Sequence, residues 1–333
     1  MNRVGQGSRP AMARGTGTSP PRTILVYQPT RAEALAYARL IRLPRASLSV
    51  RVAGSPAEAE AAIGEAEILY AWDFPRSLLR RAGRLRWVQS TGAGVEKLLG
   101  PELSPDVVVT RAAGIFGPWM AEYALGWCLW VTQRVEVFRS QQARRQWRPV
   151  DPCRLRGATL AVVGLGDIGR TIARTARAFG MTVLGVSRSG RRVPGVDRVY
   201  RATAIRTALS RADFAVLTVP LTAHTRGFVG ARELAAMKRS AWLVNVGRGA
   251  VVDEVALVRA LSSRRIAGAV LDVFEREPLP PDHPLWRLRN AVVTPHISGP
   301  STPAEVSVIF NENLRRWVAG RPLRHVVDRR RGY

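Results

Sequence analysis

Residues 158–189 constrain the fold more than any other part of the chain. The apolar, β-branched run at residues 160–163 leads into three glycines spaced G-x-G-x-x-G. A helical pattern with apolar residues on one face follows and stops at Gly180, and residues 182–186 form a second apolar run. This order and length predict a strand, a tight turn, a helix and a parallel strand, which together make a βαβ unit.

Each of the three glycines has a separate mechanical reason. Gly164 allows the tight turn, Gly166 lets a pyrophosphate approach the backbone, and Gly169 lets the helix pack closely on the strand. The free N–H groups and the positive dipole end of the helix then favour the anion. A lone glycine motif is weak evidence, but here it lies between the expected elements, so we expect a dinucleotide site rather than a plain structural turn.

The end of the second strand bears on which dinucleotide is bound. An NAD site usually has Asp or Glu there to hold the ribose 2′-hydroxyl. This chain has instead Ser187, Arg188 and Ser189, followed by Arg191 and Arg192. A guanidinium between hydroxyls suits a 2′-phosphate, so the sequence favours NADP(H), with NAD(H) still possible. An arginine on a solvated turn of an arginine-rich protein is the alternative interpretation.

Length and charge limit the classes of function. With 333 residues the chain fits two domains, and its formal net charge is +26. Only Lys97 and Lys238 are lysines, so the positive charge is almost all arginine, spread along the chain rather than clustered. We interpret this as a compositional habit, with attraction of anionic substrates as a side effect, and we expect no nucleic-acid partner.

The remaining composition indicates an intracellular protein. Cys128 and Cys153 make neither a disulfide framework nor a metal-binding pattern, which fits a reducing compartment. No run of roughly 18 apolar residues is present, so we expect no membrane span. Residues 1–22 lack the apolar core of a secretory signal and are expected to be a disordered extension. We therefore expect a cytoplasmic protein that needs no metal.

Before the glycine motif, residues 23–110 alternate between strand and helix patterns, which predicts a small doubly wound parallel domain. Ser55 with Pro56 is expected to open one of its helices. Residues 91–94 form a second glycine-rich turn, expected to lead into a short helix and to bind an anion; a plain helix start is equally compatible. A single long helix is expected at residues 118–142, with Trp147 in the polar loop beyond it.

Three polar residues follow predicted strands in the second half of the chain: Arg248, Glu277 and His296. Ligands of open α/β sheets bind beyond the carboxyl ends of the strands, so these side chains can converge. Arginine clamps a carboxylate, histidine carries a proton at neutral pH, and a nearby glutamate favours the charged imidazole and orients it. Beside a nicotinamide whose C4 delivers hydride, this set would reduce a 2-keto acid, with the proton from His296. Each residue alone has an ordinary surface explanation.

The motifs together resemble the D-isomer-specific 2-hydroxyacid dehydrogenase family. The resemblance rests on GLGDIG at 164–169, NVGRGAVVDE around Arg248, LDVFEREPLP around Glu277 and TPHISG around His296. Within that family the chain is most similar to bacterial glyoxylate/hydroxypyruvate reductases. The absent acidic residue after the second strand departs from the commoner NAD pattern and puts NAD use in doubt.

The resemblance implies roles for individual residues. Arg248 would bind substrate, His296 would be the acid and base, and Glu277 would pair with it. Ala93 and Gly94 would hold the substrate carboxylate through backbone N–H groups, while Trp147 would reach the active site of a homodimer partner. Asp272 would orient the nicotinamide amide, and the remaining cofactor contacts would be Gly164, Gly166, Asp167, Ile168, Gly169, Ser187, Arg188, Ser189, Pro220, Thr225, Val246 and Gly247.

The resulting prediction is an α/β protein with two doubly wound parallel-sheet domains. A Rossmann coenzyme domain at 117–299 would be inserted in a flavodoxin-like substrate domain made of 23–116 and 300–333. The expected reaction is NAD(P)H-dependent reduction of glyoxylate or hydroxypyruvate in a cleft between them, with residues 72–75 expected in the pocket wall. Two alternatives stay open: a reductase of another 2-keto acid, of the D-lactate or phosphoglycerate type, and a non-catalytic dinucleotide sensor that binds partners or DNA.

Overall fold

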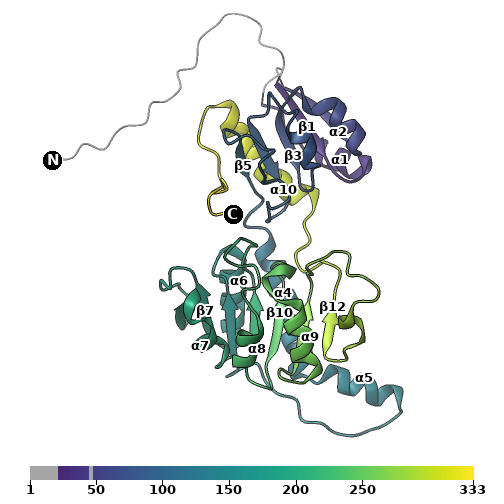
Figure 1. Cartoon of the computed structure of the whole chain (residues 1–333), viewed down its shortest axis with the longest axis vertical. Helices are drawn as coiled ribbons and strands as arrows, with labels where there is room; N and C mark the ends of the chain where they lie inside the picture. Colours follow the sequence, from purple (N-terminus) through teal and green to yellow (C-terminus); the bar gives the residue numbers. More distant parts are fainter. Residues whose placement is uncertain (1–21, 45–47) are drawn as a thin grey trace, which may run out of the picture.

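The computed structural model describes residues 22–44 and 48–333. Its elements form two lobes along the long axis of the molecule, each built around a parallel β-sheet (Figure 1). We call them the five-stranded half and the seven-stranded half. The expected extension at 1–22 lies outside the described residues except for Arg22, where the first strand begins.

The five-stranded half has the strand order β2-β1-β3-β4-β5. All neighbouring pairs are parallel. The strands are β1 (Arg22–Tyr27), β2 (Leu48–Ala53), β3 (Ala66–Ala71), β4 (Trp87–Ser90) and β5 (Val108–Thr110), with helices α1 (Arg31–Ala38), α2 (Pro56–Ile63) and α3 (Arg76–Leu79) between them. This is the flavodoxin-like order, in which the chain reverses direction across the sheet between β1 and β3. Ser55 caps α2 by accepting from Glu58 N, as its position predicts.

The seven-stranded half has the order β12-β11-β10-β9-β6-β7-β8, again with every pair parallel. Six of these strands reproduce the doubly wound dinucleotide-binding order, so the predicted fold class is confirmed. The strands are β6 (Thr159–Val163), β7 (Thr182–Ser187), β8 (Arg198–Arg201), β9 (Phe214–Leu217), β10 (Trp242–Asn245), β11 (Gly268–Leu271) and β12 (Ala291–Val293), with α6 (Asp167–Ala178), α7 (Ile205–Leu209), α8 (Ala231–Ala236) and α9 (Glu254–Ser262).

Two helices connect the halves. α4 (Phe116–Thr132) packs against α6, and Gly117 makes this approach possible because a Cβ there would lie 2.7 Å from Thr171 Oγ1. α10 (Pro303–Val318) carries the chain back to the five-stranded half, where Phe310 stacks on Tyr70 with ring centroids 4.1 Å apart. The exact domain boundaries at 116/117 and 299/300 stay a prediction.

Two local predictions are wrong. The single helix expected at 118–142 is two helices, α4 and α5 (Val135–Ala143), because Arg134 adopts a left-handed backbone with φ of 57° and breaks the run. The short helix expected after residues 91–94 is only a turn, closed by Leu98 N donating to Val95 O. The strand β8 was not expected, since its sequence RVYR has little apolar content.

Candidate functional site between the two sheets

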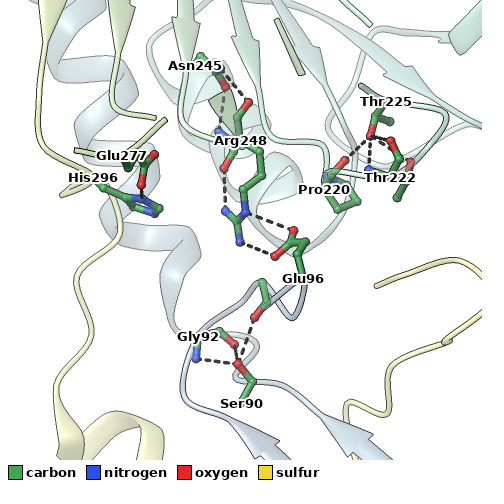
Figure 2. A network of polar contacts seen from close by, with 12 residues as sticks. Ser90, Gly92, Glu96, Pro220, Thr222, Thr225, Asn245, Arg248, Glu277 and His296 are labelled. Atoms are coloured by element: carbon green, nitrogen blue, oxygen red, sulfur yellow. Dashed lines mark hydrogen bonds and ion pairs between the residues drawn. The ribbon is translucent and has the colours of Figure 1, made fainter. Parts of the chain in front are cut away.

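The structure brings together the three polar residues predicted at strand ends. Arg248 lies three residues beyond β10, Glu277 follows β11, and His296 lies three residues beyond β12. His296 Nδ1 lies 2.8 Å from Glu277 Oε2, and Glu277 Oε1 accepts from Phe274 N at 3.0 Å. The pair is about one-third exposed, so Nε2 of the imidazole is the nitrogen left to meet a ligand. Figure 2 shows this pair and the neighbouring Arg248.

The charge of the pair is favourable for a proton donor. Burial would raise the pKa of Glu277, but hydrogen bonds from His296 and Phe274 N, together with the charges of His296 and Arg248, outweigh it and lower the pKa. Glu277 therefore stays ionised at neutral pH. An ionised carboxylate on Nδ1 accepts a hydrogen bond from the imidazole and fixes its orientation.

A buried carboxylate holds the loop that carries His296. His296 has a left-handed backbone with φ of 54°, which is unfavourable for a residue with a Cβ. Asp272 is fully buried, and its carboxylate accepts from Ile297 N, Ser298 N and Thr294 Oγ1. His296 N also donates to Asp272 O at 2.9 Å. These four hydrogen bonds offset the strain and position the imidazole.

The same network reaches the connecting helix α4. Thr294 Oγ1 lies 2.6 Å from Tyr123 Oη and donates its proton to Asp272, so the Tyr123 hydroxyl donates to Thr294. Burial raises the pKa of Tyr123 to about 12, so this hydroxyl keeps its proton. Asp272 was predicted as a cofactor contact, and within the described residues its carboxylate serves the His296 loop, with one lone pair of Oδ2 left over.

The five-stranded half faces this set with the turn after β4. Ser90 Oγ accepts from Gly92 N, and its single proton has the carbonyls of Gly92 and Gly94 within reach as acceptors. The N–H groups of Ala93 and Gly94 have no hydrogen-bond partner within the described residues. They are therefore available to an anion. The contact of Ala93 and Gly94 with the substrate carboxylate, which the family resemblance implies, stays a prediction.

Two residues of this half complete the site. Trp72 follows β3 directly, and its ring meets that of His296 edge to face, with centroids 6.1 Å apart. This places the wall segment 72–75 beside the predicted proton donor. Glu96 forms an ion pair with Arg248 across the two halves, and sequence reasoning missed it. The only signal was an acidic residue two positions after the glycine turn.

The predicted dinucleotide turn follows β6. Gly164 has φ of 102°, and a Cβ on Gly169 would overlap Gly164 O, so both glycines are required. Gly166 precedes α6 without a side-chain cap, and its Cβ position opens on free space. The N–H groups of the first helical turn are therefore free for a pyrophosphate, and the backbone fits the group.

The neighbouring loops hold the other predicted cofactor contacts. At the end of β7, Ser187 Oγ accepts from Gly190 N and Ser189 Oγ from Arg191 N, while Arg188 is exposed. After β9, Thr225 Oγ1 donates to Pro220 O at 2.6 Å and accepts from Thr222 N, which fixes that turn. Val246 and Gly247 follow β10, and Gly247 N donates to Asn245 Oδ1. The Asp167 carboxylate accepts from Gly114 N of the other half.

Trp147 lies apart from this set. It is 97% exposed in the segment after α5, which extends from the end of the seven-stranded half (Figure 1). Trp147 is therefore not packed against the site residues of its own chain. Within the described residues, no group of three or more His, Cys, Asp and Glu side chains is placed to hold a metal ion, and no helix is long and apolar enough to cross a membrane.

The chain is similar to known proteins over most of its length. Residues 125–298 match the model of the D-isomer specific 2-hydroxyacid dehydrogenase, NAD binding domain. The chain is 31% identical over 299 residues to glyoxylate/hydroxypyruvate reductase A of Serratia proteamaculans, covering 88% of this chain and 93% of the relative.

Solved structures agree over nearly the whole chain. A D-isomer specific 2-hydroxyacid dehydrogenase family protein from Aeromonas salmonicida superposes with a TM-score of 0.84 at 41% identity, covering 93% of this chain and 100% of that one. An NADPH-dependent glyoxylate/hydroxypyruvate reductase from Sinorhizobium meliloti, in complex with NADP and sulfate, gives a TM-score of 0.86 at 32% identity, covering 94% and 99%.

Proposed function

The chain belongs to the D-isomer specific 2-hydroxyacid dehydrogenase family, and on that basis we propose that it is an NADPH-preferring reductase of small 2-keto acids, glyoxylate and hydroxypyruvate first. The observation that carries the proposal is the His296–Glu277 pair beside Arg248, at the carboxyl ends of neighbouring strands. A binding protein without chemistry would not need a proton donor held in a strained backbone by four hydrogen bonds.

In the proposed reaction each residue has one task. The Arg248 guanidinium and the free N–H groups of Ala93 and Gly94 bind the substrate carboxylate. His296 Nε2 donates a proton to the carbonyl oxygen, and Glu277 holds the imidazole in place through Nδ1. When bound, NADPH would supply the hydride that reduces the carbonyl carbon. Trp72, against the His296 ring, limits the size of the substrate and excludes water from one side.

The cofactor would lie along the carboxyl edge of β6, β7, β9 and β10. The first turn of α6 would hold the pyrophosphate through the N–H groups from Gly166 to Gly169. Arg188, with the hydroxyls of Ser187 and Ser189, would bind the 2′-phosphate, because each hydroxyl accepts from the backbone and keeps its proton to donate. Pro220, Thr225, Val246, Gly247 and the spare lone pair of Asp272 would complete the site.

We also propose a cytoplasmic homodimer. α5 has no buried residue, Phe138 on it is 40% exposed, and Trp147 beyond it is almost fully exposed. An extended arm of this kind buries its apolar side chains when it packs on a second copy. The tip would then bring Trp147 to the partner's substrate site.

Steady-state kinetics test the function directly. We expect reduction of glyoxylate and hydroxypyruvate with a lower KM for NADPH than for NADH. Arg188→Ala removes a charge-assisted contact and should raise the KM for NADPH by roughly 10- to 100-fold while leaving that for NADH nearly unchanged. Arg239→Ala is the matched control. Arg239 is exposed and precedes the amino end of β10, whereas the proposed cofactor site lies at the carboxyl ends of the strands.

The outcomes separate the two parts of the proposal. A preference for NADH, or an Arg188→Ala variant as efficient with NADPH as the parent, would overturn the cofactor assignment. Absence of turnover with every small 2-keto acid would overturn the activity, and salt-dependent DNA binding in its place would favour the dinucleotide sensor.

A further inference from the structure

Each of the three guanidinium nitrogens of Arg248 contacts another atom of this chain. Its Nε lies 3.2 Å from Glu96 Oε1, and its Nη2 donates to Glu96 Oε2 at 3.3 Å. Its Nη1 donates to Gly247 O at 2.7 Å. Glu96 therefore takes the side-on edge of the guanidinium in a two-point contact, the arrangement that an arginine offers to a carboxylate ligand. Figure 2 shows Arg248 pointing from the seven-stranded half toward Glu96.

The pair lies at the turn proposed to hold the substrate carboxylate. A Cβ on Gly94 would overlap Arg248 Nη2 and would lie 2.5 Å from Glu96 Oε2. Gly94 therefore lies against both the Arg248 guanidinium and the Glu96 carboxylate. A substrate carboxylate that binds the side-on edge of Arg248 beside Gly94 would take the place that Glu96 occupies.

Two carboxylates cannot both make a two-point contact with the same edge of a guanidinium. Glu96 and Arg248 side chains are each 27% exposed, so water screens their charges only in part. An arriving anion meets an ion pair with no net charge, and it gains the full attraction of Arg248 only after Glu96 has moved away. The cost of breaking the pair is subtracted from the affinity for every carboxylate ligand.

From this geometry we infer that Glu96 acts as a built-in competitor for the substrate carboxylate, and that it sets the KM of the enzyme for 2-keto acids. The inference rests on the proposed function, because it assigns a competitor to the Arg248 site proposed there. Glu96 also links the two halves through Arg248, so displacement by substrate releases one contact between them.

A binding experiment isolates this role from chemistry. Oxalate, an unreactive carboxylate of similar size, is titrated by calorimetry into full-length protein saturated with NADP. Glu96→Gln keeps the shape of the side chain and removes its charge, so oxalate should bind roughly three- to tenfold more tightly than to the parent protein. The KM for glyoxylate should fall by a similar factor.

The control makes the same change of charge elsewhere in the five-stranded half. Glu65→Gln breaks the ion pair with Arg51, whose Nη2 lies 2.8 Å from Glu65 Oε2, and both residues are exposed. It should leave oxalate affinity and KM unchanged. Equal tightening in both variants would mean that only net charge matters and would overturn the inference.

The remaining outcomes distinguish the inference from the proposed function. If the parent binds oxalate and reduces glyoxylate but Glu96→Gln binds equally or more weakly, Glu96 orients Arg248 instead of competing with substrate, and the inference alone fails. If neither the parent nor either variant binds oxalate or reduces a 2-keto acid, the proposed function fails, and the competitor role of Glu96 fails with it.

Discussion

The two halves share one architecture but present different chemistry at the facing edges of their sheets. The seven-stranded half supplies ionisable side chains after three neighbouring strands: Arg248, Glu277 and His296. The five-stranded half supplies backbone N–H groups, the Trp72 ring and the competing carboxylate of Glu96. In the proposed reaction the seven-stranded half therefore supplies the proton donor, whereas substrate binding is shared between its Arg248 and the turn and Glu96 of the five-stranded half.

The largest expected effect lies in the seven-stranded half. His296→Ala removes the proton donor, and kcat for glyoxylate reduction should fall by roughly 10² to 10⁴, with a small change in KM. His283→Ala is the control, because His283 Nε2 lies 3.5 Å from Glu254 in another His–Glu contact of the same half. Near-normal turnover by His296→Ala, measured with saturating NADPH, would contradict the assignment of His296 as the proton donor.

The counterpart in the five-stranded half is Gly94→Ala. The added Cβ overlaps Arg248 Nη2 and must push the guanidinium aside, so the KM for 2-keto acids should rise by about tenfold or more, the cost of one weakened charge-assisted contact. Gly83→Ala, where a Cβ meets no atom within 4 Å, should behave like the parent. A fall in kcat without a change in KM would mean that Gly94 affects the chemical step and not substrate binding, which would contradict the role proposed for this turn.

Much of the seven-stranded half could be predicted because its signals are local. The strand, glycine turn and helix at β6 and α6 lie within one short stretch, and Gly164 and Gly169 each have a local steric reason. Asp253 caps α9 by accepting from Ala256 N, which is likewise a contact between near neighbours in the sequence. Arg248, Glu277 and His296 could be grouped because parallel strands place all their carboxyl ends at one edge.

The five-stranded half was harder to predict at the site because its contacts are distant in sequence. Glu96 and Arg248 are separated by 152 positions, and Trp72 meets His296 only after both sheets have formed. The break between α4 and α5 depends on a left-handed arginine, which no local pattern announces. The role of Asp272 in holding the His296 loop likewise requires the positions of backbone N–H groups that periodicity does not give.

The smallest expected effect concerns the Glu277–His296 pair and is read from pH dependence. The pKa of Glu277 is lowered in the folded protein, so the ionised carboxylate adds stability above its unfolded pKa, and this contribution is lost as pH falls through the folded pKa. Glu277→Gln should therefore lower the free energy of unfolding at pH 7 and lose that disadvantage in acid, as urea titrations at both pH values would measure.

Activity gives the second and independent reading of the same substitution. Without the carboxylate on Nδ1, the His296 imidazole loses the hydrogen bond that orients it, so kcat for 2-keto acid reduction should fall. The KM for glyoxylate should change little, because Arg248 and the β4 turn are untouched. An unchanged kcat with a raised KM would instead mean that Glu277 contributes to substrate binding and not to the positioning of the proton donor.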